Sequence, residues 1–134
     1  MKKLASIVLV ALLTSLLASC SQVPITGRSR LNFIPDMEIN EMAAQSYQQF
    51  ISDNKTKVQA DSPEARLVLQ VGSNIQKAVE DYMSANNLYH EIAGFDWQFT
   101  LIEQDEVNAW AMPGGKVVVY SGILPYTQDE HGLA

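Results

Sequence analysis

Five consecutive residues, His90-Glu91-Ile92-Ala93-Gly94, begin like the zinc-binding motif HExxH and could therefore do metal chemistry. That motif needs a second histidine one helical turn after the first, so that both imidazoles bind one zinc ion and the glutamate activates a bound water. Here Gly94 stands in the fifth position and precedes a β-rich segment, and His131 is the only other histidine of the chain. We therefore interpret His90 as a loop histidine after a helix end and His131 as a solvated surface residue.

The sequence offers no other recognisable catalytic set. It has no Ser-His-Asp arrangement, no phosphate-binding glycine loop and no cysteine pair, because Cys20 is its single cysteine. Asp105 and Glu106 are adjacent carboxylates in a predicted turn, which is typical of a solvated face. We therefore predict no catalytic residue and no metal ligand within this chain.

The N-terminal residues are typical of a bacterial lipoprotein. Lys2 and Lys3 precede an uncharged, mostly apolar run of signal-peptide length, and Leu17-Ala18-Ser19-Cys20 resembles a lipobox. We expect a signal peptide over residues 1–19 and a lipid on Cys20, although an ordinary secretory signal with a chance cysteine is the alternative. The expected location is the bacterial cell envelope, lipid-anchored on the periplasmic side and at the outer membrane.

The charge balance argues against nucleic acid as a partner. The whole chain has nine basic and fifteen acidic residues, a net charge of −6. Without Lys2 and Lys3 the count is 7 − 15 = −8 for the expected mature chain. Such a surface repels nucleic acid and anionic lipid, so only the lipid on Cys20 is expected to contact a membrane.

Hydrophobic periodicity and turn residues predict an α+β fold, in which two helices precede a small, mainly antiparallel three-stranded sheet. Val117 to Tyr120 are consecutively apolar, which indicates a strand buried on both faces. Residues 20–35 are expected to form an extended tether. The expected helices run from Asp36 to about Asp53 and from Pro63 to near Asn86-Asn87, and the second is expected to have Ser62 as its N-cap and Pro63 at its first position. The expected strands cover Trp97–Ile102, Asn108–Met112 and Lys116–Tyr120.

Turn chemistry adds two local predictions. Gly114 and Gly115 suit a two-residue hairpin turn that needs positive φ at both positions, with Pro113 before it. Thr127 and Glu130 fit a capping box, so a helix is expected to begin at Thr127.

The stretch "NAWAMPGGKVVVYSGIL", from Asn108 to Leu124, resembles the signature hairpin of the CAAX-prenyl-protease and HtpX-like zinc metallopeptidases, peptidase family M48. The resemblance is closest to the bacterial lipoprotein branch of that family. It extends to "VPITGRSRLNFIP", to the helix from Asp36, to "WQFTLIEQDEVNAWAMPGGK" and to "GILPYTQDEHGLA".

This resemblance implies a membrane-anchored periplasmic zinc metalloendopeptidase that acts on unfolded or misassembled envelope proteins. In the family, HExxH lies on the helix that follows the segment matching Thr127–Glu130, and a later glutamate completes the zinc site. No residue here matches those positions. We therefore expect residues 36–134 to be the N-terminal part of the domain, truncated before the zinc motif, incomplete at its C-terminus, inactive as given and unable to bind the family's zinc.

The resemblance also implies that the hairpin flanks the substrate cleft. Asn108, Ala109, Trp110, Ala111 and Met112 are the candidate edge to which an extended substrate adds as a strand, with Gly114 and Gly115 permitting close backbone approach. A purely structural hairpin is the alternative for each of these residues. At the level of the protein, the alternatives are a catalytically inactive lipoprotein that binds unfolded clients through this edge and a lipid-anchored structural domain without a peptide site.

Overall fold

The computed structural model describes residues 20–31 and 34–134. The chain divides into two units, Met1–Pro35 and Asp36–Ala134. The predicted signal peptide, residues 1–19, lies outside the described part of the chain.

The first unit contains a short antiparallel hairpin within the segment expected to be an extended tether. Strand β1 (Cys20–Gln22) pairs with β2 (Ser29–Leu31). The turn between them is closed by a hydrogen bond from the Val23 amide to the Arg28 carbonyl, 2.8 Å long. Cys20 is the first residue of β1, and its lipidation stays a prediction.

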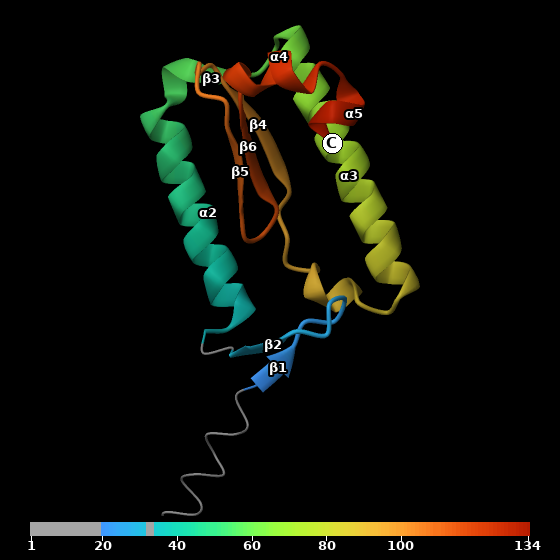
Figure 1. The fold of residues 1–134 in the computed structure, drawn as a ribbon. Helices are drawn as coiled ribbons and strands as arrows, with labels where there is room; N and C mark the ends of the chain where they lie inside the picture. The colour runs from blue at the N-terminus through green and yellow to red at the C-terminus, as the bar shows by residue number, and fades with distance from the viewer. Residues whose placement is uncertain (1–19, 32–33) are drawn as a thin grey trace, which may run out of the picture. The chain divides into compact units, whose positions relative to one another are not determined.

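The second unit is a four-stranded sheet with a long helix on each face, α2 on one side and α3 on the other (Figure 1). Two short helices, α4 and α5, follow the last strand and pack with α3 at one end of the sheet (Figure 1). The elements are α2 (Asp36–Asp53), β3 (Val58–Gln59), α3 (Pro63–Ala85), β4 (Gln98–Ile102), β5 (Ala109–Met112), β6 (Lys116–Tyr120), α4 (Leu124–Thr127) and α5 (Glu130–Leu133), with 3₁₀ turns η2 (Lys55–Lys57), η3 (Tyr89–Glu91) and η4 (Ser121–Ile123).

The expected fold, two helices and then a mainly antiparallel three-stranded sheet, is wrong. The sheet has four strands in the order β3-β4-β6-β5, and β3 comes from the connection between α2 and α3. The central pair β4–β6 is parallel, so the sheet is mixed, and four α-helices occur among residues 20–31 and 34–134. Strand β3 has two residues in a polar stretch, so no apolar alternation could reveal it.

The parallel pairing depends on the β4–β5 connection, which passes over the end of β6. The Gly122 amide donates a hydrogen bond to the Gln104 carbonyl at 2.8 Å, and the Ser121 hydroxyl accepts from the Gln104 amide at 3.0 Å. A Cβ at Gly122 would overlap the carbonyl oxygen of Asp105, so a glycine is needed where the two backbones cross. The crossing places β5 beyond β6 and leaves β4 and β6 as neighbours.

Strand β6 is buried on both faces, which confirms the prediction from its unbroken apolar run. Val118 is 0% exposed and packs toward α2 with Tyr47 and Ile102. Val119 is 6% exposed and packs toward α3 with Val68. The two clusters fix the position of β6, and β6 in turn holds β5 through backbone pairing.

The start of α3 follows its predicted cap. The Ser62 side chain accepts a hydrogen bond from the Ala65 amide at 3.0 Å, and Pro63 occupies the first helical position. The helix ends at Ala85 with Asn86 as its C-cap, and Asn87 follows with a positive φ of 59°, close to the predicted end. No helix of the described ranges is long and apolar enough to span a membrane.

The predicted capping box at Thr127 is wrong. Thr127 is the last residue of α4, and its hydroxyl donates a hydrogen bond to the Leu124 carbonyl. The N-cap of α5 is Asp129, whose carboxylate accepts from the amides of His131 and Gly132, both at 2.9 Å. A helix therefore does start in this segment, but two residues later and with a different capping side chain.

Candidate functional site

The β5–β6 hairpin closes with a three-residue turn. Met112 pairs with Lys116, which leaves Pro113, Gly114 and Gly115 between the strands. Gly114 and Gly115 have φ values of 78° and 81°, so the predicted positive φ at both positions is confirmed. The expected two-residue loop is wrong, because Pro113 lies inside the turn and not before it.

Strand β5 is the outer strand of the sheet, at the edge away from β3. The Tyr120 amide donates to the Asn108 carbonyl at 3.1 Å, so these two residues form a pair that is hydrogen-bonded between the strands. Hydrogen-bonded and non-hydrogen-bonded pairs alternate along an antiparallel ladder. The backbone N–H and C=O groups of Ala109 and Ala111 therefore point out of the sheet. Pro113, the next outward position, has no N–H, and the row of donors stops there.

The two faces of β5 differ in size and cover. Trp110 and Met112 are half-buried on the α2 side, where the Phe50 ring meets the Trp110 ring edge-on with centroids 4.9 Å apart. Ala109 and Ala111 are exposed, and their partners on β6, Val119 and Val117, belong to the apolar cluster on the α3 side. The face of β5 that carries Ala109 and Ala111 is thus exposed, whereas the face that carries Trp110 and Met112 is packed against other side chains.

Asn108 does not contribute its side chain to this edge. Its amide nitrogen donates to the Glu106 carboxylate at 2.9 Å, within the connection that precedes β5. The sequence placed seven residues, Asn108 to Met112 with Gly114 and Gly115, in one candidate group. The structure brings them into one hairpin but gives the open main-chain positions to only two of the strand residues, Ala109 and Ala111.

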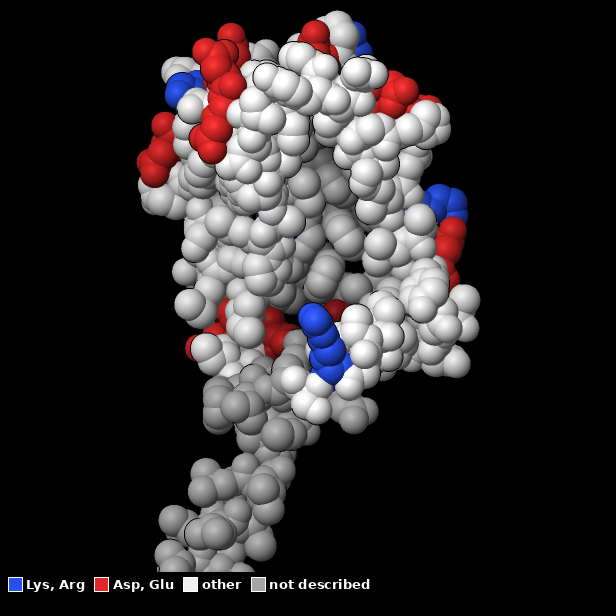
Figure 2. All heavy atoms as spheres, in the orientation of Figure 1, with Lys and Arg blue, Asp and Glu red and all other residues white. Residues whose placement is uncertain are grey.

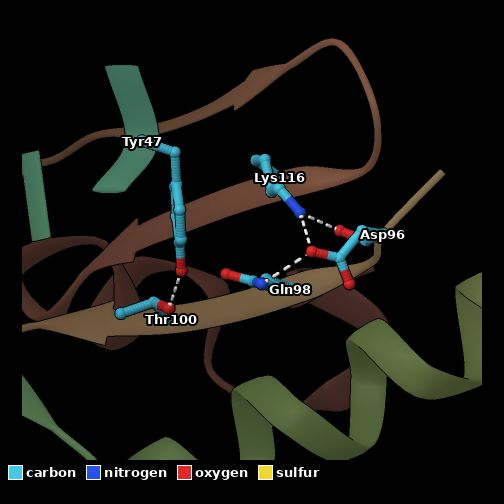
Figure 3. Close-up of polar contacts among 5 residues, drawn as sticks. All are labelled: Tyr47, Asp96, Gln98, Thr100 and Lys116. Atoms are coloured by element: carbon cyan, nitrogen blue, oxygen red, sulfur yellow. Dashed lines mark hydrogen bonds and ion pairs between the residues drawn. The ribbon is translucent and has the colours of Figure 1, made fainter. Parts of the chain in front are cut away.

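Hydrogen bonds hold the turn of the β5–β6 hairpin against the start of β4 and the residues just before it. The Lys116 side chain is 2% exposed, and its ammonium donates to the Asp96 carboxylate at 2.6 Å and also to the Asp96 carbonyl (Figure 3). The backbone adds two bonds, from the Asp96 amide to the Gly114 carbonyl at 3.0 Å and from the Gln98 amide to the Gly115 carbonyl at 2.9 Å. These contacts fix the turn against β4, and a Cβ at Gly115 would lie 2.8 Å from the Trp97 ring.

Charge and aromatic contacts both stabilise the buried lysine. The Lys116 ammonium lies 5.9 Å from the centre of the Tyr47 ring, within range of a cation–π interaction, and the Tyr47 hydroxyl is hydrogen-bonded to Thr100 (Figure 3). The hydrogen bond and charge of Lys116 hold the pKa of the Asp96 carboxyl below its ordinary value, and Gln98 adds a weaker hydrogen bond. Lys116 is not among the site residues predicted from the sequence, although a lysine that begins an apolar strand directly after two glycines was a signal that could have identified it.

A cavity of about 630 Å³ adjoins this tip. Its wall comes from the start of α2, from η3 and from the hairpin, and acidic side chains gather near the start of α2 (Figure 2). The charged residues that line it are Asp36, Glu41, Glu91, Asp96 and Lys116, together with His90.

The described residues do not fit a zinc site. Among residues 20–31 and 34–134, no three His, Cys, Asp or Glu side chains come close enough to share a metal ion. His90 is exposed in η3 with its Nε2 atom 3.4 Å from the Glu91 carboxylate, and His131 is exposed in α5 with its Nε2 atom 3.8 Å from Glu130. No chemical step of a zinc peptidase can be assigned to these side chains.

Comparison with known proteins supports the family resemblance over part of the chain. Residues 70–134 match the model of peptidase family M48. The chain is 29% identical over 111 residues to the mitochondrial metalloendopeptidase OMA1 of Danio rerio, covering 82% of this chain and 22% of that protein. It is 30% identical over 113 residues to the mitochondrial metalloendopeptidase OMA1 of Schizosaccharomyces pombe, covering 84% of this chain and 30% of that protein. The OMA1 protein of Bos taurus is 23% identical over 111 residues.

These relatives correct two expectations from the sequence. The expected location, lipid-anchored on the periplasmic side of a bacterial outer membrane, is contradicted because the matched relatives are named as mitochondrial proteins. The assignment to a bacterial lipoprotein branch is not supported for the same reason, whereas the family itself is confirmed. The chain spans between 20% and 30% of the length of these three relatives. Residues 70–134 therefore match a domain of peptidase family M48.

Proposed function

We propose that this chain supplies the client-binding edge of a zinc-dependent metalloendopeptidase, and that unfolded or misassembled proteins are its clients. The observation that carries the proposal is the position of β5 at the sheet edge, with the backbone groups of Ala109 and Ala111 directed outward. The family match and the metalloendopeptidase names of the relatives support the enzyme class.

Main-chain recognition accounts for the class of client. Ala109 and Ala111 each offer one N–H and one C=O, and a client segment that adds as a strand can use all of them. Each hydrogen bond is worth only about 0.5–1.5 kcal/mol net, so the edge alone binds weakly and with little sequence preference. A folded protein has already paired its own backbone groups and cannot lie along the edge. An extended, unpaired segment can.

The fixed hairpin tip suits this role. A strand that receives a client must keep its register and direction before the client arrives, because any ordering on binding subtracts from the affinity. The bonds from Lys116 and from the backbone of Asp96 and Gln98 hold the turn against β4. The described residues bind and orient the client in this proposal, and the zinc chemistry of the family is not assigned to any of them.

A proline substitution tests the edge directly. Ala111→Pro removes one outward N–H, and proline is tolerated on an edge strand when its nitrogen faces away from the neighbouring strand. The matched control is Ala111→Ser, which keeps the N–H and is close to alanine in size. Binding of fluorescently labelled β-casein to the full chain, followed by anisotropy, should weaken in the proline variant and persist in the serine variant. Equal binding by both variants would contradict the use of this edge.

A further inference from the structure

The side chains of a client strand divide between the two faces of the sheet according to the register of β5. Residues that lie directly opposite each other on paired strands have their side chains on the same face. Client residues opposite Ala109 and Ala111 therefore direct their side chains toward the α3 side, the side of Val117 and Val119. The client residue between them directs its side chain toward the α2 side.

The α3 side is apolar and has free space. A cavity of about 120 Å³ lies between α3, α5 and the sheet, and every residue that lines it is apolar or glycine. Val117 and Val119 form its wall nearest to β5, and they pair with Ala111 and Ala109. The lining residues are Val68, Val71, Gly72, Ile75, Trp97, Phe99, Val117, Val119 and Leu133.

Because Ala109 and Ala111 are small, a client side chain can reach the apolar surface on the α3 side of the sheet. Neighbouring strands lie about 4.8 Å apart, so a long client side chain that lies across an alanine reaches toward β6. A larger residue at position 109 or 111 would occupy that path, whereas alanine adds a single methyl group. Both alanines are exposed, so no other described side chain already fills the space above them.

The α2 side offers no comparable space. Trp110 and Met112 occupy it beside the edge, and the Phe50 ring closes on Trp110 with an interplanar angle of 86°. A client side chain on that side meets a packed surface and gains little burial. Only every second residue of the client, with its side chain on the α3 side, therefore gains burial on binding.

We infer that the edge selects client segments that carry large apolar side chains two residues apart, opposite Ala109 and Ala111. This inference rests on the proposed function, because it requires that clients bind as a strand along β5. It adds that Ala109 and Ala111 determine specificity by their small size. Unfolded segments that would form half-buried strands have this alternating pattern, which defines the substrate class by its chemistry.

Three synthetic peptides distinguish the inference from the proposed function. Each has ten residues of serine and threonine with two guest positions: leucines at i and i+2, leucines at i and i+3, or alanines at i and i+2. The first peptide should bind the full chain about tenfold more tightly than the third, since two additional large side chains become buried. The second, with the same composition as the first, should bind more weakly than the first because its leucines face opposite sides.

Matched variants test the role of the alanines. Ala109→Leu and Ala111→Leu should abolish the preference for the leucine peptide while keeping the binding of the alanine peptide, and Ala93→Leu, in the exposed turn before β4, should change neither. Equal affinity for all three peptides would overturn the inference and leave the proposed function standing. Absence of binding by any peptide would overturn both. A uniform loss of affinity in the leucine variants would refute selection by size.

Discussion

Asp96→Asn should destabilise the unit of residues 36–134 more than Lys116→Met does, although each substitution removes the same ion pair. The asparagine variant leaves the Lys116 charge buried at 2% exposure without an anionic partner. The methionine variant removes the buried charge, fills similar space with an apolar side chain, and leaves an Asp96 side chain that is 77% exposed and readily hydrated. Replacing a buried ion by an apolar residue is often neutral, whereas removing one partner of a buried pair is costly.

The expected loss of stability depends on the burial of the two partners, because the Lys116 side chain is buried and the Asp96 side chain is exposed. Breaking a fully buried pair costs about 3–5 kcal/mol, and a surface pair contributes about 0–1 kcal/mol. The Lys116 ammonium keeps the Asp96 carbonyl and the Tyr47 ring as partners, and water reaches the carboxylate side. We therefore expect a loss of about 1–3 kcal/mol for Asp96→Asn and less than about 1 kcal/mol for Lys116→Met.

Chemical and thermal unfolding of the full chain measure this difference. For a unit of about this size, each kcal/mol corresponds to a change of about 4–8 °C in Tm. Because the folded pKa of Asp96 is lowered, its contribution to stability is present above its unfolded pKa of about 3.9 and is lost as the pH falls through the folded value. The difference in unfolding free energy between wild type and Asp96→Asn should thus be constant near neutral pH and decrease below about pH 4. A larger loss of unfolding free energy in Lys116→Met than in Asp96→Asn would show that the unpaired buried charge of Lys116 is not the costly consequence of breaking the pair.

Three further substitutions test the elements that position the edge. Gly122→Ala should cost about 1–3 kcal/mol or more in unfolding free energy, because its Cβ would overlap the backbone of the crossing connection, whereas Gly94→Ala, whose Cβ has 3.8 Å to its nearest neighbour, should be tolerated. Ser62→Ala removes the α3 cap and should lower the stability by about 1 kcal/mol in urea unfolding. Asp129→Ala should speed amide exchange at Gly132 by nuclear magnetic resonance, since the carboxylate that accepts its hydrogen bond is lost.

The helices could be predicted because their signals are local. Helix α2 has the predicted bounds, and α3 begins with the predicted Ser62 cap, since apolar spacing and capping act within one turn of the chain. Strand β6 was also found, with its burial on both faces, from an unbroken apolar run. In each case the residues that determine the element lie inside it or directly beside it.

The sheet order could not be predicted because it depends on contacts between distant residues. Strand β3 is two residues long and gains its place only by pairing with β4, more than forty positions along the chain. The parallel β4–β6 pair requires the backbone crossing at Gly122, and no local sequence pattern predicts that crossing. The candidate edge was named from a family resemblance, but the outward direction of Ala109 and Ala111 follows only from the sheet order and register.

Amide hydrogen exchange of the full chain with and without β-casein shows whether a client pairs with β5. The amides of Ala109 and Ala111 point out of the sheet and should exchange rapidly in the free protein, while those of Trp110 and Met112 are protected by pairing with β6. We predict that β-casein slows exchange at Ala109 and Ala111 and leaves exchange at the opposite edge, Val58 and Gln59, unchanged. Binding of β-casein with no added protection at Ala109 and Ala111 would contradict it.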